Sequence, residues 1–359
     1  MQDKEAIVIV GAGCIGLCTA YNLSKTLSSQ GAESDIIVVD AFDRPFPAAS
    51  SACTGCFHYY FPGPLSKPLE PLGKHSFDLW AKEAQHADFR LATGYRSNSS
   101  YGVLQGDGKG LDKLPNWVKT KTSWNVNTKV LGDSTATVEG QGKTTISCKQ
   151  LLLACGPWTP TVYEQLFPSA PVHLQWTTNA GDWIVCKNPC LTTFDSTAFV
   201  SFEPLIGEKF EFAGRNDGTI WACGRRNLDA NLPSPGHHSS PDEDFIEEIS
   251  GRARQWLNWH CACEEGHDDD VQILKQGGVF RPMTKSGLPV ISPVLSSDII
   301  SSTGSHRTGI FVCWGHGSWG LTLGMGSGRV MSQLMCGETP DLDLSAFSLK
   351  QESISQEES

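Results

Sequence analysis

The chain contains 359 residues, of which 39% are hydrophobic and 19% charged, so it is long enough for one large domain or two modest ones with sizeable cores. Its formal net charge is −11 and no cluster of Lys or Arg interrupts the acidic balance, which argues against a nucleic-acid partner. No apolar run approaches the roughly 18 residues of a membrane-spanning helix. We therefore expect a soluble, enzyme-sized protein without a nucleic-acid or membrane partner.

The sequence also bears on the compartment. Its 13 cysteines, an odd number without the spacing of a disulfide framework, are typical of a reducing environment. The first predicted strand begins almost at Met1, which leaves no room for a signal peptide, and residues 357–359 carry no peroxisomal signal. We therefore expect a cytoplasmic location.

The N-terminal part of the chain is predicted to form one βαβ unit. Residues 6–10 are an apolar strand, and residues 14–28 place apolar side chains at mostly helical spacing before Gly31, a typical helix end. Residues 35–40 then form a second buried strand. The order of strand, glycine-rich turn, helix and strand is thus intact.

The rest of the chain alternates between helix and strand signals. Helices are predicted at residues 72–87, from their amphipathic spacing, and at residues 242–260, whose acidic first turn suits the helix dipole. Strand and hairpin signals lie at residues 136–145, 150–155, 197–212 and 218–226, with Asn216-Asp217-Gly218 as a hairpin turn. The middle of the chain is therefore β-rich, whereas the acidic, Ser-rich tail of residues 338–359 is predicted to be disordered.

The turn after the first strand carries the pattern GxGxxG between a strand and a helix, where the pattern is most informative. Gly11 permits the tight turn, Gly13 lets a pyrophosphate approach the backbone, and Gly16 allows close packing of helix on strand. Asp40, at the end of the second strand, is placed to accept hydrogen bonds from a ribose diol, which disfavours NADP. The pattern predicts a dinucleotide site without separating FAD from NAD, and a glycine-rich turn without a ligand is the alternative.

Three segments near the C-terminus indicate FAD and not NAD. They are GVFRP at residues 278–282, GLPVI at residues 287–291 and GIFVCWGHGSWGLT at residues 309–322. In these segments the chain resembles the D-amino-acid oxidase-like family of FAD-dependent oxidoreductases, which includes glycine and sarcosine oxidases. Residues 153–158 match that family more loosely. The resemblance covers both ends of the chain well and the middle poorly.

This resemblance implies an α/β fold in which a discontinuous Rossmann-type FAD-binding domain carries an inserted, mostly antiparallel α+β substrate domain. The expected FAD-binding domain comprises residues 1–60, 125–168 and 275–337. The expected substrate domain comprises residues 61–124 and 169–274.

The resemblance and the glycine-rich turns together indicate which residues would hold FAD. Small residues before a helix N-terminus let backbone N–H groups approach the flavin carbonyls and stabilise the reduced, anionic flavin, although a packed glycine turn would look the same. Cys313 lies inside an apparent strand, so noncovalent FAD is expected. The predicted cofactor-binding residues are Gly11, Gly13, Cys14, Ile15, Gly16, Asp40, Ser50, Ser51, Gly55, Val130, Gly156, Trp158, Gly317, Ser318, Trp319, Gly320, Leu321 and Thr322.

The resemblance also implies a chemistry, the oxidation of a small-molecule amine or amino acid. Hydride would pass from the substrate α-carbon to flavin N5, and molecular oxygen would reoxidise the flavin to give hydrogen peroxide. A dehydrogenase with another electron acceptor, or a non-catalytic FAD module, is the alternative.

Three residues are predicted to act on the substrate. Arg281 matches the family position whose guanidinium often grips a substrate carboxylate, with an arginine paired to a structural carboxylate or covering the flavin edge as the alternative. Trp319 is predicted to close the pocket beside the flavin, and His58 to extend toward the substrate. Aromatic packing alone would explain both of these.

Cys53 and Cys56 stand in C-x-x-C spacing within SSACTGCFH and allow three interpretations. A zinc site would need two further ligands at suitable spacing, so no metal is predicted. A second hypothesis makes the two thiols redox partners of a thiol or disulfide substrate. The favoured interpretation is that both cysteines pack as small apolar side chains in a flavin-facing loop.

Overall fold

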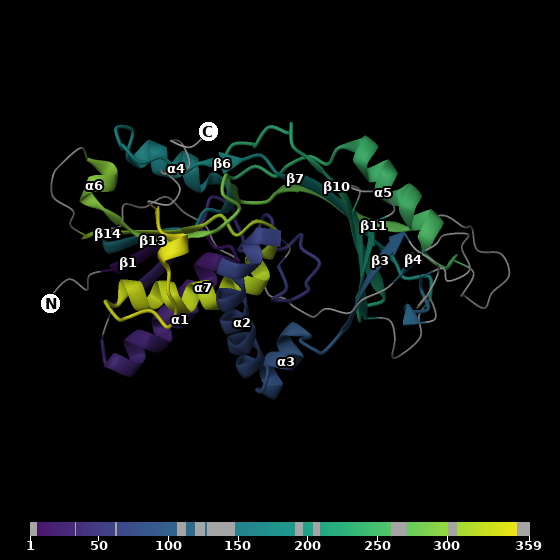
Figure 1. Cartoon of the computed structure of the whole chain (residues 1–359), viewed down its shortest axis with the longest axis horizontal. Coiled ribbons are helices and arrows are strands. Elements are labelled where there is room, and N and C mark those ends of the chain that lie inside the picture. Colours follow the sequence, from purple (N-terminus) through teal and green to yellow (C-terminus); the bar gives the residue numbers. More distant parts are fainter. Residues whose placement is uncertain are drawn as a thin grey trace.

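The computed structural model of the chain describes residues 6–32, 34–61, 63–105, 113–118, 126–127, 148–190, 197–203, 209–259, 271–300 and 307–349. Within these residues the strands form a five-stranded sheet and a seven-stranded sheet, joined by a short two-stranded pairing (Figure 1). The hairpin predicted at residues 136–145 and the predicted site residue Val130 lie outside the described residues. None of the described helices has the length and apolar character needed to cross a membrane.

The five-stranded sheet is the core of the predicted Rossmann-type unit. Its strand order is β13-β14-β5-β1-β2, and all neighbours are parallel except the pair of β13 with β14. Its strands are β1 (Ala6–Val10), β2 (Ile36–Val39), β5 (Cys148–Leu153), β13 (Val290–Leu295) and β14 (Arg307–Trp314). Parallel strands covered on both faces read as continuous apolar runs, and this explains why the sequence pattern identified β1 and β5.

Three helices cover one side of this sheet in close contact with one another (Figure 1). They are α1 (Cys14–Gln30), α2 (Ser66–Glu83) and α7 (Gly320–Met335). Helix α1 ends at Gly31, whose φ of 64° is left-handed as predicted for a glycine helix end. Helix α2 begins before the predicted residue 72 and stops at Glu83, and the separate helix α3 (Ala87–Thr93) follows.

The contact between α1 and α7 depends on two glycines. A Cβ atom on Gly324 would lie 2.6 Å from the Sγ atom of Cys14, and one on Gly328 would lie 2.5 Å from the carbonyl carbon of Cys18. Since residue 14 faces residue 324 and residue 18 faces residue 328, the two helices run parallel. Their N-termini therefore lie at the same end of the sheet.

The seven-stranded sheet forms the second unit. Its strand order is β11-β7-β10-β9-β8-β3-β4, and its neighbours are antiparallel except for β3 with β8. Its strands are β3 (Ser99–Gln105), β4 (Val126–Asn127), β7 (Ala180–Lys187), β8 (Ala198–Glu203), β9 (Phe210–Gly214), β10 (Thr219–Asn227) and β11 (Ile273–Phe280). The predicted hairpin joins β9 to β10 through Gly218, whose φ is 79°.

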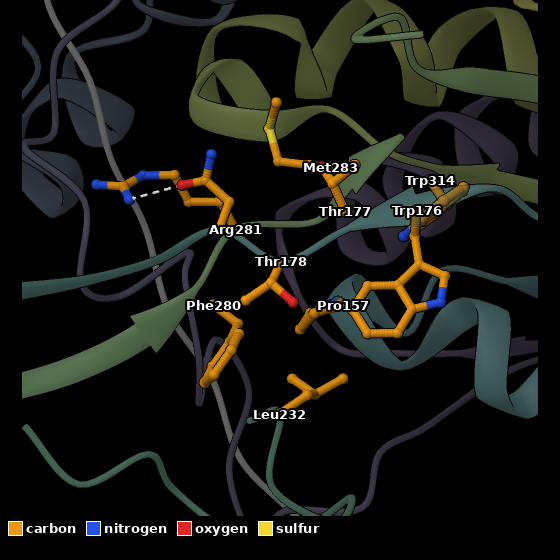
Figure 2. Close-up of a pocket in the computed structure, with 10 residues that line it drawn as sticks. Pro157, Trp176, Thr177, Thr178, Leu232, Phe280, Arg281, Met283 and Trp314 are labelled. Carbon is orange, nitrogen blue, oxygen red and sulfur yellow. Dashed lines mark hydrogen bonds between the residues drawn. The ribbon is translucent and has the colours of Figure 1, made fainter. Parts of the chain in front are cut away.

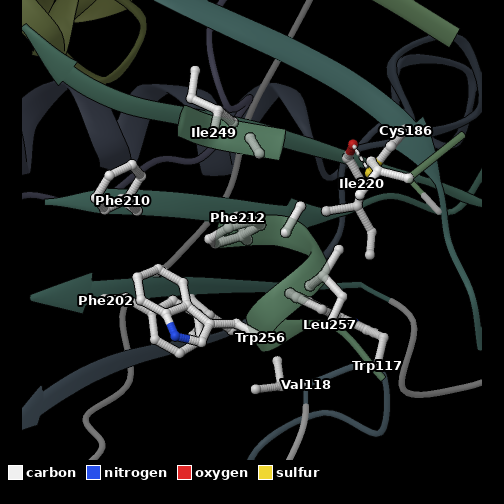
Figure 3. Packing of buried hydrophobic residues seen from close by; sticks show 14 of the residues in the cluster. Trp117, Val118, Cys186, Phe202, Phe210, Phe212, Ile220, Ile249, Trp256 and Leu257 are labelled. Atoms are coloured by element: carbon white, nitrogen blue, oxygen red, sulfur yellow. Dashed lines mark hydrogen bonds between the residues drawn. The ribbon is translucent and has the colours of Figure 1, made fainter. Parts of the chain in front are cut away.

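One face of the seven-stranded sheet packs against helix α5 (Glu243–Trp256) (Figure 3). The indole ring of Trp256 stacks on the ring of Phe202 with centroids 4.4 Å apart, and Phe210 and Phe212 meet the same indole edge-on. The predicted acidic start of this helix is confirmed, since the Asp242 carboxylate accepts a hydrogen bond from the Asp244 N–H group at 3.1 Å. The opposite face is therefore left to meet the five-stranded unit.

Short elements complete the two units and the links between them. They are η1 (Gly63–Leu65), η3 (Gly156–Trp158), α4 (Thr159–Leu166), β6 (Trp176–Thr177), β12 (Met283–Thr284), α6 (Ser296–Ile299), η5 (Gly317–Trp319) and η6 (Ser345–Phe347). Strands β6 and β12 pair with each other, and Met283 also forms a bridge with His316.

Two parts of the expected domain division differ from the structure. Strands β4 and β11 belong to the seven-stranded sheet, although β4 and most of β11 fall in the ranges expected for the FAD-binding domain. Helix α2 packs on α7, although it falls in the range expected for the substrate domain. The resemblance covers the middle of the chain poorly, and a motif such as GVFRP does not show to which sheet its strand belongs.

The tail is also not disordered throughout. Residues 338–349 are described, and Phe347 and Leu349 are 3% and 1% exposed because they pack into the clusters on the two opposite faces of the five-stranded sheet. Two apolar side chains in an otherwise polar tail are enough to dock it. Cys190 is disulfide-bonded, and the cytoplasmic location stays a prediction.

The close contact of α1 with α7 can be tested with Gly328→Ala. We expect the added methyl group to overlap the Cys18 backbone and to lower the free energy of unfolding by about 1–3 kcal/mol. Denaturant unfolding followed by circular dichroism measures this change. The control is Gly251→Ala in α5, where nothing lies within 4 Å of the new Cβ atom and a gain of about 0.5–1 kcal/mol is expected. A Gly328→Ala protein as stable as the wild type would contradict this account of the packing.

Candidate functional site

The first site element is the turn between β1 and α1, which only glycine can form. Gly11 has a φ of 114°, and a Cβ atom there would overlap the carbonyl oxygen of Ala154 on the neighbouring strand. A Cβ atom on Gly16 would overlap the carbonyl oxygen of Gly11. The turn therefore lies in close contact with β5. Gly13 has no side chain, so it leaves the start of α1 uncovered. The backbone N–H groups of Gly13, Cys14, Ile15 and Gly16 stand at this positive helix end.

Asp40 and Ser50 lie against this turn, as predicted. The Asp40 carboxylate accepts hydrogen bonds from the N–H groups of Ala12 at 2.6 Å and Phe42 at 3.0 Å. The Ser50 hydroxyl accepts a hydrogen bond from the Cys14 N–H group at 3.1 Å. A carboxylate has about four lone-pair sites, so Asp40 retains acceptor capacity for a ribose diol.

The second site element is the start of α7. Gly317 has a φ of 57°, and a Cβ atom there would lie 2.6 Å from the Sδ atom of Met283. The helix start carries no side-chain cap and no acidic residue in its first turn. Gly317, Ser318, Trp319, Gly320, Leu321 and Thr322 therefore present backbone groups at a second uncapped positive helix end, next to the start of α1.

Other predicted cofactor-binding residues have protein partners of their own. The Trp158 indole donates a hydrogen bond to the Pro233 carbonyl at 2.7 Å, next to Gly156, whose φ is 57°. The exposed Ser51 hydroxyl donates to the Ala48 carbonyl at 3.1 Å. Gly55 has a φ of 85° and is buried. These residues shape the loops around the two helix ends, and direct contact with a cofactor stays a prediction.

The arrangement fits a dinucleotide that carries an isoalloxazine ring. Two parallel helices place their positive ends side by side, and glycines keep side chains away from both ends. Phosphate groups are stabilised at one such end, and a flavin carbonyl that gains negative charge on reduction is stabilised at the other. No group of three His, Cys, Asp or Glu side chains in the described ranges could hold a metal ion.

Arg281 lies at the end of β11, beside the start of α7. The Pro282 carbonyl accepts a hydrogen bond from the Gly317 N–H group at 2.8 Å, which fixes Arg281 next to that helix end. The Arg281 Nη1 atom donates to the Asn179 side-chain oxygen at 3.1 Å and to the Ala180 carbonyl at 3.4 Å (Figure 2). No carboxylate pairs with Arg281 among the described residues, so the predicted alternative of a structural ion pair finds no support there.

A hollow adjoins this arginine where the two sheets meet (Figure 2). Its cavity volume is only about 10 Å³, the room of about one water molecule. It is lined by Pro157, Trp176, Thr177, Thr178, Asn179, Leu232, Phe280, Arg281, Met283 and Trp314. The lining is mostly apolar with one cation at its edge, a composition typical of sites for small organic ligands.

His58 and Trp319 also lie at the start of α7, and both have packing partners. The His58 N–H group donates to the Thr322 hydroxyl at 3.3 Å, and its Nδ1 atom lies 3.0 Å from the Tyr60 carbonyl oxygen. Burial lowers the pKa of His58, so its ring is neutral at pH 7. The Trp319 ring meets the Phe61 ring edge-on at 5.3 Å. The structure thus brings both residues to the site, while their roles toward a substrate stay predictions.

Several polar residues at this site were missed by the sequence interpretation. On the seven-stranded sheet, the Lys209 ammonium lies 2.5 Å from the Glu211 carboxylate, and the Cys223 thiol lies 3.8 Å from the same carboxylate. Burial alone would raise the pKa of Glu211, but the charge and hydrogen bond of Lys209 and the charge of Arg281 hold it below its usual value. These side chains therefore lie within electrostatic reach of one another. The only available signal was the alternation of Phe210, Glu211 and Phe212, which puts Glu211 on the face opposite the two buried rings.

Cys53 and Cys56 lie in an irregular segment rather than at a helix start. Burial raises the pKa of the Cys53 thiol to about 11, and the thiol donates to the Ser50 carbonyl at 3.1 Å. Cys56 packs against the apolar cluster that includes Trp221 on the seven-stranded sheet. A reactive dithiol needs a depressed pKa, so these contacts favour the packing interpretation.

His316 gives the site region a defined pH dependence. Its imidazole is 1% exposed, its Nε2 atom lies 2.9 Å from the Ser327 hydroxyl, and burial lowers its pKa to about 3. In the unfolded chain this imidazole takes up a proton below about pH 6.5. The contribution of the neutral, buried His316 to the free energy of unfolding is therefore complete above that pH. It is lost as the pH falls from about 6.5 toward 3.

We therefore expect His316→Gln to flatten the acid side of the stability profile. Between about pH 6 and 4 the free energy of unfolding of the wild type should fall faster than that of the variant by about 1 kcal/mol per pH unit. Urea unfolding at a series of pH values measures both slopes. The exposed His173→Gln should keep the wild-type slope, and equal slopes in the wild type and His316→Gln would show that His316 does not stay neutral in the folded protein.

Comparison with known proteins identifies the family. The model of the family described as DAO, FAD dependent oxidoreductase, matches residues 6–141 and 125–334. A Schizosaccharomyces pombe protein named as an oxidoreductase, without a stated substrate, is 22% identical over 93% of this chain and 95% of its own length.

Solved structures share the fold. Glycine oxidase from Geobacillus kaustophilus superposes with a TM-score of 0.69 at 15% identity, covering 96% of this chain and 98% of its own. L-proline dehydrogenase from P. horikoshii superposes with a TM-score of 0.70 at 11% identity, covering 99% of both chains. With both helix ends, the two sheets and the family match agreeing, this chain belongs to the DAO family of FAD-dependent oxidoreductases.

Proposed function

We propose that this enzyme oxidises an amine or amino acid that carries a carboxylate, and that Arg281 holds the carboxylate. The observation that carries this proposal is the hydrogen bond between the Pro282 carbonyl and the Gly317 N–H group, which ties Arg281 to the flavin-binding helix end. The names of glycine oxidase and L-proline dehydrogenase, which share the fold, support the same substrate class.

We further propose how the chain holds FAD. The start of α1, with Asp40 and Ser50, would take the pyrophosphate and ribose, and the start of α7 would face the flavin ring. Bound FAD would accept the hydride that leaves the substrate, and with it the two electrons of the oxidation. The chain's own contribution is alignment, because a short distance and a correct angle between the reacting atoms lower the barrier.

The residues around Arg281 suit a neutral amine next to a bound carboxylate. The Nη1 atom of Arg281 is held by Asn179 and Ala180, so its Nε and Nη2 atoms are oriented for a two-point contact. His58 is neutral at pH 7 because burial lowers its pKa, so it adds no positive charge that would repel an amine. The apolar lining of the hollow keeps water away from this region.

The electron acceptor and the dithiol hypothesis need separate tests. We propose that molecular oxygen reoxidises the enzyme and yields hydrogen peroxide, and peroxide release on substrate addition distinguishes this from a dehydrogenase with another acceptor. The contacts of Cys53 and Cys56 do not favour the dithiol hypothesis. Reduction by dithiols alone, lost in Cys53→Ser, would revive it.

The direct test of the proposed function uses the purified protein with FAD. Without oxygen, its visible absorption is recorded while amines and D- and L-amino acids are added one at a time. We expect one carboxylate-bearing amine to bleach the flavin bands. Bleaching by none of them, or a protein that takes up no FAD, would contradict the proposal.

Removal of the Asp40 charge should weaken FAD binding. In Asp40→Asn the ribose loses a charge-assisted hydrogen bond, worth about 1.5–3 kcal/mol, so the dissociation constant should rise at least about tenfold. Titration of the apoprotein with FAD, followed by quenching of flavin fluorescence, measures it. The exposed Asp43→Asn removes the same charge three residues later and should leave the constant unchanged. Equal affinity in Asp40→Asn would remove Asp40 from the FAD site.

Removal of the Arg281 charge should weaken substrate binding and spare FAD binding. In Arg281→Gln we expect KM for the carboxylate substrate to rise about tenfold or more, because a charge-assisted pair is lost. Steady-state kinetics and the flavin spectrum measure the two effects. Lys275→Gln, on the exposed part of the same strand, is the control. An unchanged KM in Arg281→Gln would contradict the role proposed for this guanidinium.

A further inference from the structure

Two arginines from different strands meet on the face of the seven-stranded sheet that looks toward the five-stranded unit. The guanidinium of Arg281 lies over Gly181, since a Cβ atom on Gly181 would be 2.5 Å from Arg281 Nη1. Arg226 is the residue of β10 that pairs directly with Gly181. Directly paired residues of antiparallel strands share a face and lie about 5 Å apart. The two arginines are therefore close neighbours.

The face on which Arg226 lies follows from its strand neighbours. Trp183 and Cys223 are also paired directly, and Cys223 belongs to the apolar cluster against which Cys56 packs from the five-stranded unit. Arg225 points the other way, because its Nε atom bonds the Glu248 carboxylate of α5 at 2.7 Å. Arg226 therefore stands on the same side as Arg281, and it is exposed at the edge of the site.

Two carboxylates lie within electrostatic reach of the arginines, but neither forms an ion pair with them. Glu211 interacts with the charges of both arginines and forms its ion pair with Lys209, and Asp182 interacts with the charge of Arg281. In the part of the chain that the structure describes, neither Arg226 nor Arg281 has a carboxylate within ion-pair distance. Partial burial of the guanidinium group and the charge of Arg281 lower the pKa of Arg226, and the charge of Glu211 opposes this shift. Two guanidinium groups this close repel each other, and an anion bound between them would relieve the repulsion.

From this geometry we infer that the substrate carries a second carboxylate, which Arg226 binds while Arg281 binds the first. The inference rests on the proposed function and narrows the substrate to a short aminodicarboxylate. Guanidinium groups take carboxylates in two-point contacts, and two carboxylates separated by a few bonds match two guanidiniums on neighbouring strands. An exposed Arg226 at the edge also places the second carboxylate nearer to solvent than the first, so that the reacting carbon lies deeper, toward the start of α7.

The test compares substrates that differ by one charge at nearly equal shape. The enzyme with FAD is reduced without oxygen by aspartate or asparagine, and by glutamate or glutamine, each in D and L forms, in a stopped-flow instrument. We expect the diacid to be preferred over its amide by about ten- to a hundredfold in the rate of flavin reduction at low substrate concentration, as for one charge-assisted hydrogen bond. Equal rates with acid and amide would overturn the inference.

Variants assign this preference to one side chain. Arg226→Gln should reduce the preference to near unity by slowing flavin reduction with the diacid. The matched control, Arg225→Gln, removes the same charge from the adjacent residue on the opposite face and should keep the preference. Arg281→Gln should slow flavin reduction by the acid and by the amide to the same extent. A preference retained in Arg226→Gln contradicts the inference.

A binding measurement separates recognition from turnover. Succinate should perturb the flavin spectrum of the wild type at concentrations about tenfold or more below those needed for butyrate, and Arg226→Gln should lose this difference. Failure of every amino acid to reduce the flavin would contradict the proposed function and this inference with it. Reduction by monocarboxylic amino acids, with no preference for diacids, would overturn this inference alone.

Discussion

The close parallel contact between α1 and α7 is the constraint on which the rest of the site depends. Gly324 and Gly328 bring α7 within van der Waals distance of Cys14 and Cys18, and larger residues would hold the helices apart. Because the helices are parallel, their positive ends come together. A pyrophosphate and a flavin carbonyl can then be stabilised by backbone groups from opposite ends of the sequence.

A second constraint links this helix pair to the substrate side. The hydrogen bond from Gly317 to the Pro282 carbonyl joins the start of α7 to the end of β11. The position of Arg281 is thus set from two sides, by this hydrogen bond and by Asn179 and Ala180 in the middle part of the chain. A motif at the C-terminal end was enough to propose Arg281 from the sequence, whereas the residues that hold its guanidinium group lie where the resemblance was poor.

The sequence was sufficient to predict positions at which the backbone geometry, and not a side chain, is the requirement. Gly11, Gly16 and Gly317 occupy positions that a side chain would clash with, so the requirement is visible in the residue type itself. The hairpin at Gly218 and the helix end at Gly31 were predictable for the same reason. By contrast, Glu211 belongs to a strand in which apolar and polar residues alternate. This alternation identifies the two faces of the strand but not the face that meets the five-stranded unit. That choice is made by α5, which follows β10 along the chain and covers the face of Phe210 and Phe212.

The tail shows a related limit of composition. Residues 338–349 are rich in polar and acidic side chains, and composition alone predicts disorder for them. Phe347 and Leu349 are nevertheless buried against two different clusters, one on each face of the five-stranded sheet. An average over a segment conceals the few side chains that find a partner, and the partners here come from distant parts of the sequence.

The arginines on β10 show why a register cannot be read from alternation alone. Counting in steps of two from Cys223 would place Arg225 opposite Gly181, on the face of Arg281. The pairing shifts between Cys223 and Arg226, so that one extra residue is accommodated and Arg226 takes this position instead. Arg225 is thereby turned to Glu248 on α5, and Arg226 lies beside Arg281 with no carboxylate partner among the described residues. A single bulged residue, invisible in the pattern RRN, thus decides which of two adjacent arginines stabilises the fold and which one is available to a substrate.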